Sequence, residues 1–183
     1  MHPVRVAALV VALLVAGAGA VAVAAPQKKR DKSRKAAAIL RDADGDRVGR
    51  VELRQRGETV TISVRARDLP PGFHGFHVHA VGACRAPDFK SAMGHLKEGD
   101  QGHGAHLGDL PSLLVTDDGT ARLVAETDRF GISGLRSGDG AAFMVHEKPD
   151  NFGNVPSRYV PQTDQETRDT GDAGPRIACG VVR

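Results

Sequence analysis

Six histidines and one aspartate form the most informative pattern in this chain, because their types and spacing predict two neighbouring metal sites. They are His77, His79, His95, His103, His106, Asp109 and His146. The sequence has eight histidines, so only His2 and His74 fall outside this set. In a strand, residues two apart point to the same side, so His77 and His79 project together while Val78 faces the core. Imidazole nitrogens are good ligands for copper and for zinc.

The set divides into two groups of ligands. His95, His103, His106 and Asp109 supply three imidazoles and one carboxylate, which is a saturated tetrahedral set for zinc and a closed, structural kind of site. His146 completes a nitrogen-rich site with His77 and His79. Taken alone, His-x-His also occurs in cupins, which need a glutamate that residues 80–88 lack. Scattered surface histidines in a glycine-rich loop are the alternative that the whole pattern disfavours.

The segments that must position these side chains are predicted to be strands. Apolar residues alternate with polar ones in Val48–Gln55 and Thr59–Arg67, which we expect to form a hairpin. A second hairpin is predicted around Asp117-Asp118-Gly119, and two further strands at Ala141–Glu147 and Arg176–Val182. No convincing helical period is present. These patterns predict an all-β sandwich or barrel.

Two long stretches, about 82–111 and 148–175, have no period and are expected to be functional loops. The first contains Cys84 and four of the candidate ligands, so a metal and a disulfide would order a segment that cannot order itself. Asp42–Asp46 resembles the start of a calcium loop, but Arg47 and Leu53 stand where an EF-hand needs glycine and an acid. We therefore expect a plain turn there.

The amino-terminal region predicts export. Residues 1–24 have the short positive start, apolar run and small residues of a signal peptide cut after Ala24, and an uncleaved membrane anchor is the alternative. Residues 25–35 are a basic run that we expect to be a disordered linker, although attraction to an anionic cell surface or nucleic acid is the other interpretation. Residues 36–183 form one domain. Two cysteines behind a secretion signal suggest one disulfide in an oxidising compartment.

A family resemblance is carried by five segments. They are Gly72–His79, Gly94–Leu96, His106–Leu110, Met144–Asn151 and Gly171–Val181. With these motifs in this order, the chain resembles a secreted, bacterial-type copper/zinc superoxide dismutase, from about Val48 to Val182. The resemblance implies a flattened eight-stranded Greek-key barrel with two long functional loops.

The resemblance also implies a role for each residue. Copper would be held by His77, His79, His95 and His146, and zinc by His95, His103, His106 and Asp109, with His95 bridging the two metals. Asp150 would hydrogen-bond one ligand of each metal, Arg176 would guide the substrate anion, and Cys84 and Cys179 would form the intrasubunit disulfide. His74 would be a structural histidine bonded to backbone. The segment between His103 and His106 is shorter than in many members, which puts the zinc geometry in question.

The implied activity is disproportionation of superoxide to dioxygen and hydrogen peroxide by cycling between Cu(II) and Cu(I), with His95 protonated when copper is reduced. The alternative is a non-catalytic copper/zinc carrier or buffer of the same fold. We expect a secreted or cell-envelope protein, or a membrane-anchored one, that is a monomer or homodimer. Nucleic acid is not an expected partner, and membrane contact is expected only through residues 1–35.

Overall fold

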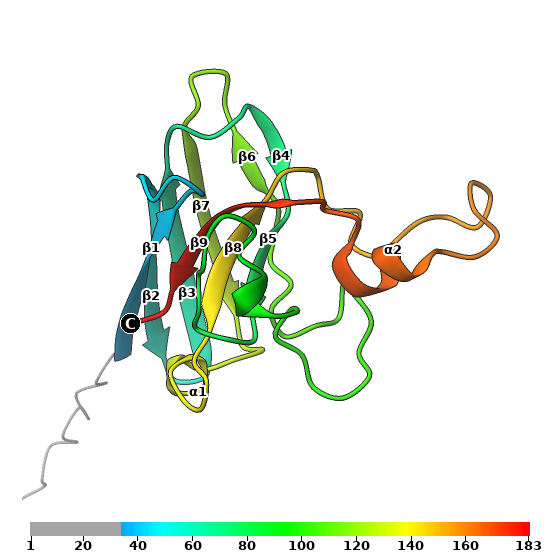
Figure 1. The fold of residues 1–183 in the computed structure, drawn as a ribbon. Helices are drawn as coiled ribbons and strands as arrows, with labels where there is room; N and C mark the ends of the chain where they lie inside the picture. The colour runs from blue at the N-terminus through cyan, green and yellow to red at the C-terminus, as the bar shows by residue number, and fades with distance from the viewer. Residues whose placement is uncertain (1–33) are drawn as a thin grey trace, which may run out of the picture. The chain divides into compact units, whose positions relative to one another are not determined.

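The computed structural model describes residues 34–183. The predicted signal peptide and most of the predicted linker lie outside these residues. The elements are β1 Arg34–Arg41, β2 Arg47–Arg56, β3 Thr59–Ala66, β4 Gly72–His74, β5 Phe76–His79, the 3-10 turn η1 Lys90–Ala92, β6 Leu113–Val115, β7 Ala121–Thr127, α1 Ile132–Leu135, β8 Ala142–His146, α2 Gln165–Thr170 and β9 Arg176–Val181 (Figure 1). Arg34 and Lys35, which the sequence assigned to the linker, belong to β1.

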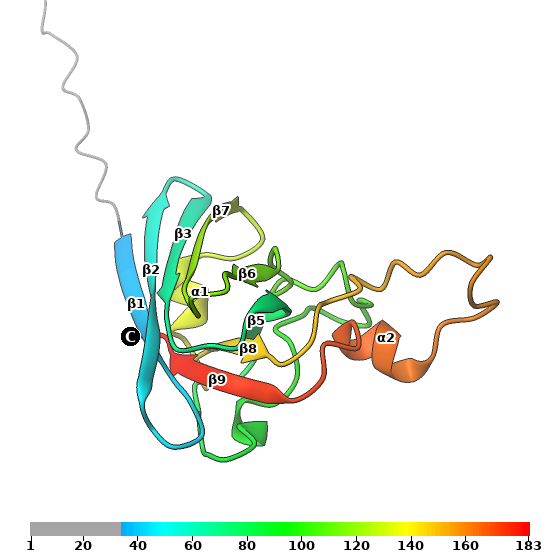
Figure 2. The ribbon, with the colours of Figure 1, turned by 90° about the horizontal axis from the view of Figure 1, so that it is seen from above.

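The strands form one antiparallel sheet that nearly closes into a barrel (Figure 2). The strand order is β4-β6-β7-β3-β2-β1-β9-β8-β5, so the sheet ends on two strands that are consecutive in sequence and separated only by Gly75. The connections from β3 to β4, β5 to β6 and β7 to β8 join strands that are not neighbours, as expected for a Greek key. The all-β barrel prediction is confirmed.

Nine strands replace the expected eight because the chain breaks at Gly75. β4 pairs with β6, whereas β5 pairs with β8, so the two short strands belong to opposite ends of the sheet. A side chain at this break has no room, since a Cβ on Gly75 would lie 2.6 Å from the Cβ of Ala173. The break therefore sets where β5, which carries His77 and His79, starts.

The predicted alternation places the core inside the barrel. Val60, Ile62 and Val64 are buried on the inner face of β3, and Arg65 is exposed on the outer face. β2 and β3 form the predicted hairpin, in which Arg56 pairs with Thr59. Phe76 and Phe143 stack in the core with ring centroids 5.5 Å apart. The hydrophobic interior thus fixes the register of the strands on which the histidines lie.

The two aperiodic stretches are long loops outside the sheet, and each contains a short ordered element. The second includes α2, which the sequence did not predict because six residues are too few for a helical period. Its capping signals were nevertheless present: the Asp164 carboxylate accepts a hydrogen bond from the Thr167 backbone N–H, and Gly171 ends the helix at φ 69°. Within residues 34–183, no helix is long and apolar enough to cross a membrane.

Asp42–Asp46 forms a turn between β1 and β2, as expected. The Asp42 carboxylate accepts hydrogen bonds from the backbone N–H groups of Asp44 and Asp46, at 3.1 and 2.8 Å. This side chain closes the turn between β1 and β2 in the way that aspartate commonly does.

A disulfide joins Cys84 in the first loop to Cys179 in β9, as expected. The bond spans 95 positions of sequence and packs in a small buried cluster with Phe89, Ala92 and Met144. It therefore fastens a loop that has little regular structure to the sheet.

Removing this disulfide should destabilise the protein strongly. We expect Cys84→Ser combined with Cys179→Ser to lower the free energy of unfolding of the metal-free protein by about 4 to 5 kcal/mol, because the bond no longer restricts a long loop of the unfolded chain. Urea unfolding followed by circular dichroism measures this. Reductant should shift the wild-type curve and leave the double variant unchanged; a wild-type curve insensitive to reductant would contradict the prediction.

Candidate metal centre

All seven predicted metal ligands lie together and are buried, with exposed fractions of 8% or less. His77 and His79 come from β5 and His146 from the end of the adjacent β8. His95, His103, His106 and Asp109 come from the first long loop, which is joined to β5 by isolated bridges from His79 to His95 and from His77 to Asp109. The sheet thus supplies three ligands, and the loop supplies the rest.

The first group of donors is His77, His79, His95 and His146, whose donor atoms lie within 4.8 Å of one another. His79 donates from Nδ1 to the carbonyl of Met93 at 2.8 Å, and His146 donates from Nδ1 to the carbonyl of Gly174 at 2.9 Å. These bonds fix each tautomer so that Nε2 carries a free lone pair. The two Nε2 atoms face each other at 3.4 Å.

The second group of donors surrounds one oxygen of Asp109. The Nδ1 atoms of His95, His103 and His106 lie 3.1, 3.2 and 3.3 Å from Asp109 Oδ1. The other oxygen of Asp109 accepts hydrogen bonds from the backbone N–H groups of Gly104 and His106. The short segment between His103 and His106 therefore allows both rings to approach the carboxylate. A compact four-donor cluster here contains His77, His95, His103 and Asp109, and His106 lies beside it.

The ring of His95 stands between the two groups. Its Nδ1 belongs to the Asp109 group, and its centroid is 4.1 Å from that of His77 and 4.9 Å from that of His79. Its Nε2 is buried and has no hydrogen-bond partner among the described residues, and the same holds for Nδ1 of His77 and of His103. Orphaned buried nitrogens are costly unless a cation occupies the space between them. The donor set therefore fits two metal ions that share one imidazole.

The pKa values of the histidines are consistent with this fit. Burial lowers the pKa of His95 to about 4 and that of His146 to about 3, and it lowers the pKa of His79 well below its usual value. These rings stay neutral, as metal ligands must. For His103, burial is outweighed by the neighbouring carboxylates of Asp109 and Asp150, which raise its pKa to about 9. The second group thus favours a positive charge at its centre.

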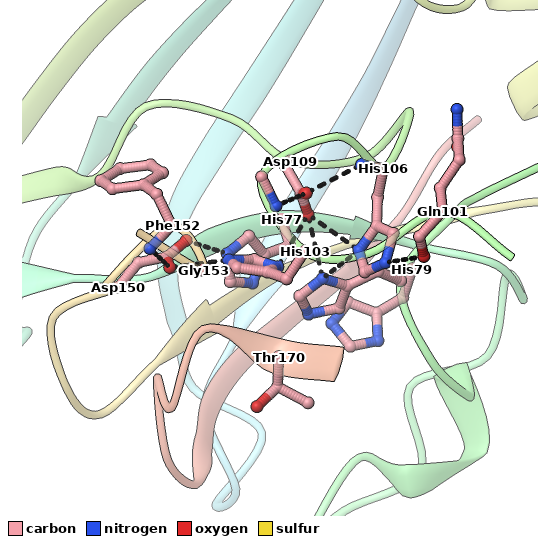
Figure 3. Close-up of polar contacts among 12 residues, drawn as sticks. His77, His79, Gln101, His103, His106, Asp109, Asp150, Phe152, Gly153 and Thr170 are labelled. Atoms are coloured by element: carbon pink, nitrogen blue, oxygen red, sulfur yellow. Dashed lines mark hydrogen bonds and ion pairs between the residues drawn. The ribbon is translucent and has the colours of Figure 1, made fainter. Parts of the chain in front are cut away.

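Asp150 forms hydrogen bonds with one ring of each donor group, as the sequence predicted. Its Oδ2 accepts a hydrogen bond from His77 Nε2 and its Oδ1 accepts one from His103 Nε2, both at 2.7 Å (Figure 3). The backbone N–H of Phe152 also donates to Oδ1 at 2.7 Å. The three donors hold the pKa of Asp150 low although burial opposes this. The carboxylate fixes the orientation of one ring in each group.

Gly171, at the end of α2, covers the contact between Asp150 and His103, and sequence reasoning did not single it out. A Cβ at this position would lie 2.0 Å from Asp150 Oδ1 and 2.3 Å from His103 Nε2. The carbonyl of Arg168 in α2 also accepts a hydrogen bond from the backbone N–H of His103 at 2.8 Å. The second loop is therefore packed directly against the ligands of the first.

An open pocket leads from solvent to the first group. It is lined by His79, His95, His146 and Arg176, together with three lysines that the sequence did not identify: Lys90, Lys97 and Lys148. The Arg176 guanidinium donates to the carbonyls of Phe89 and Met93, at 2.8 and 2.7 Å. The carbonyl of Met93 therefore accepts hydrogen bonds from both Arg176 and His79. A small anion entering this pocket meets a fixed cation beside the rings of His79, His95 and His146.

His74 stays outside the centre, as expected. Its Nδ1 lies 2.8 Å from the carbonyl oxygen of His146 and its Nε2 lies 2.8 Å from that of Pro70. The ring is buried and spans from β4 to the end of β8. It is a structural side chain in the core.

Comparison with known proteins identifies one family. The family model described as copper/zinc superoxide dismutase matches residues 47–182. A superoxide dismutase [Cu-Zn] of Mycolicibacterium paratuberculosis is 42% identical over 163 residues, which are 78% of this chain and 71% of the relative. A relative of the same name from Mycobacterium tuberculosis is 42% identical, and the match covers 76% of this chain and 66% of that relative. Another from Escherichia coli is 36% identical, and the match covers 76% of this chain and 80% of that relative.

Solved structures agree with these relatives. A double mutant of a SOD-like protein from Bacillus subtilis has a TM-score of 0.67 at 31% identity and covers 79% of this chain and 95% of its own. The clock protein EA4 has a TM-score of 0.67 at 30% identity, with coverage of 82% and 94%. The fold is thus shared with known structures over 79% to 82% of the chain.

A side chain at Gly171 should weaken metal retention. We expect Gly171→Ala to lower zinc affinity about 10- to 100-fold and copper affinity less, because the added methyl group displaces the Asp150–His103 contact. Metal analysis after dialysis against a chelator measures both ions. Gly138→Ala is the matched control, since Gly138 has φ 56° but nothing within 4 Å of a Cβ. Equal zinc retention in the two variants would contradict the prediction.

Proposed function

This chain belongs to the copper/zinc superoxide dismutase family, and from that membership we propose the residues by which it disproportionates superoxide to dioxygen and hydrogen peroxide. The observation that carries the proposal is the His95 ring, whose two nitrogens face two separate donor groups. A shared imidazole of this kind is useful only if both groups hold a cation.

Copper would be held by Nδ1 of His77, by Nε2 of His79 and His146, and by Nε2 of His95. When bound, copper supplies the one-electron redox couple that oxidises one superoxide to dioxygen and reduces another to peroxide. The carbonyls of Met93 and Gly174 keep His79 and His146 in the tautomer that this requires. His95 can hold at Nε2 one of the two protons that peroxide formation consumes.

Zinc would be held by Nδ1 of His95, His103 and His106 and by Oδ1 of Asp109. The backbone donors of Gly104 and His106 orient the carboxylate, and the carbonyl of Gln101 accepts a hydrogen bond from His106 Nε2 at 2.9 Å. All donors are closed in by protein, which favours a structural ion that holds the His95 ring in place.

Arg176 would bind the substrate anion at the edge of the copper group. Its guanidinium stays charged at any working pH and offers a fork of donors to oxygen. Lys90, Lys97 and Lys148 add positive charge along the pocket, opposed by Asp88, Glu166, Asp169 and Asp172. Because the carboxylates equal the cations in number, the electrostatic attraction of a small anion rests on the position of Arg176 beside the copper group.

We also propose that the protein works outside the cytoplasm, as a monomer or homodimer. The disulfide supports an oxidising compartment. Residues 1–24 would be a signal peptide that is removed, residues 25–35 would be largely linker, and the following residues would be the dismutase domain.

A non-catalytic copper/zinc carrier is the alternative function. The copper set together with Arg176 argues against it, because a carrier needs open access to metal more than it needs a guanidinium in the pocket. A fully loaded wild-type protein that dismutated superoxide only at the background rate would favour the carrier.

Losing His146 should abolish turnover. We expect His146→Ala to lose nearly all dismutase activity, because the copper group loses one of its four nitrogen donors while the barrel keeps its other contacts. Superoxide decay after pulse radiolysis, normalised to bound copper, measures this. Full activity per copper in the variant would remove His146 from the site.

The zinc assignment has its own test. Loss of a residue that hydrogen-bonds a metal ligand typically weakens metal binding by roughly 10- to 100-fold. Asp109 would contact zinc directly, so we expect Asp109→Ala to reduce zinc retention by more than this and to reduce copper retention less. Atomic absorption of dialysed protein measures both metals, with exposed Asp139→Ala as the control. Equal loss of both metals would refute the assignment.

A further inference from the structure

Three arginines lie side by side across the outer face of the sheet. Arg50 in β2 pairs in register with Arg65 in β3, which pairs in register with Arg122 in β7. Arg50 forms an ion pair with Glu52 at 2.8 Å, whereas neither Arg65 nor Arg122 has a carboxylate within ion-pair distance among residues 34–183. Like charges directly opposite one another destabilise a sheet. The row therefore costs stability when the protein is alone.

The row belongs to a larger basic surface, which we call the arginine face. It comprises Lys35, Arg50, Arg54, Arg56, Arg65, Arg122 and Arg183, with only Glu52 and Glu126 opposing, and five of its cations line one shallow groove. The charge is unevenly distributed over the molecule. Residues 1–33 contain five of the 25 Lys and Arg residues and one of the 22 Asp and Glu residues. Residues 34–183 therefore contain 20 basic and 21 acidic residues, which gives a net charge of −1. The arginine face nevertheless has an excess of five positive charges.

The face lies away from the metal centre. β2 and β3 are in the middle of the strand order, and β4 and β5 are at its ends, so the barrel places the arginine face opposite β5. Figures 1 and 2 both show β1 and β2 on the side of the barrel away from α2. A partner on this face would leave the pocket above the copper group open.

The chemistry of the face indicates phosphate as its ligand. Arginine binds phosphate in a two-pronged geometry, and several guanidinium groups on a flat sheet suit an array of phosphates. β1, β2, β3 and β7 contain no aromatic residue that could stack on nucleic-acid bases. In the sequence, Lys28, Lys29, Arg30 and Lys32 directly precede β1, so a second block of cations is continuous in the chain with a strand of this face.

We propose that the arginine face docks on an anionic phospholipid surface, with the open pocket directed away from it. This extends membrane contact beyond residues 1–35, to which the sequence had limited it. Repulsion within the arginine row destabilises the free protein, and lipid phosphates bound between the guanidinium groups relieve this repulsion. The proposal does not depend on the metal assignments, because the face contains none of the metal ligands.

Vesicle binding by the metal-loaded protein, in the form that its host exports, tests the proposal. Wild type should sediment with phosphatidylglycerol vesicles and not with phosphatidylcholine vesicles. Arg65→Gln combined with Arg122→Gln should weaken binding about 30-fold, since each arginine near such a surface contributes about 1 kcal/mol. The same variant should melt at a higher temperature, because the like charges are gone, and should keep full dismutase activity.

Arg85→Gln combined with Arg158→Gln is the matched control, because it removes the same charge from exposed loop positions that are not among the seven cations of the face. Equal vesicle binding by the two double variants would overturn the proposal. So would equal binding of wild type to both kinds of vesicle, or tighter binding to duplex DNA at the same phosphate concentration and salt. Loss of dismutase activity in wild type would instead bear on the metal centre.

Discussion

The structure depends on one electrostatic constraint: nitrogen lone pairs buried a few ångströms apart must be separated by a cation or a proton. The Nε2 atoms of His79 and His146 face each other at 3.4 Å, and the Nδ1 atoms of His95 and His106 at 3.3 Å. In the first group, burial lowers the pKa of the rings, so protons are disfavoured there. A metal ion satisfies several lone pairs at once, so the folding of this region and the binding of metal are two aspects of one equilibrium.

The two loops are ordered through this centre rather than by their own structure. The first loop has almost no regular element, and its contacts with the rest of the molecule include the ligands, the isolated bridges to β5, the disulfide and the hydrogen bonds from Arg176. The second loop contributes Asp150, which accepts a hydrogen bond from His103 Nε2, and Gly171, which packs against the same ring. The backbone N–H of His103 also donates to the carbonyl of Arg168, so a change in either loop is transmitted to the other through the ring and the backbone of His103. This explains why a glycine that binds no metal is as constrained as a ligand.

The sequence predicted most of the barrel, because apolar alternation and turn residues are local signals that burial then enforces. The family motifs also named residues that lie together in the structure and the two cysteines of the disulfide, while the metal that each group holds stays a prediction. It did not reveal the break at Gly75, α2, the role of Gly171 or the pocket lysines. α2 was missed because six residues are too few for a helical period. The other features depend on close approach between segments distant in sequence, such as Gly75 against Ala173, and no local pattern encodes that. The arginine row was hidden for the same reason, because its members belong to three strands.

The charge distribution has a consequence for the substrate. Superoxide is an anion, and a domain with a net charge of −1 attracts it only where cations are concentrated. The arginine face, on the far side of the barrel, is one such place on residues 34–183. In the pocket, four carboxylates equal the four cations in number, so the attraction of a small anion there rests on Arg176, which is held beside the copper group by the carbonyls of Phe89 and Met93. An anionic partner on the arginine face neutralises that face and leaves Arg176 open to the anion.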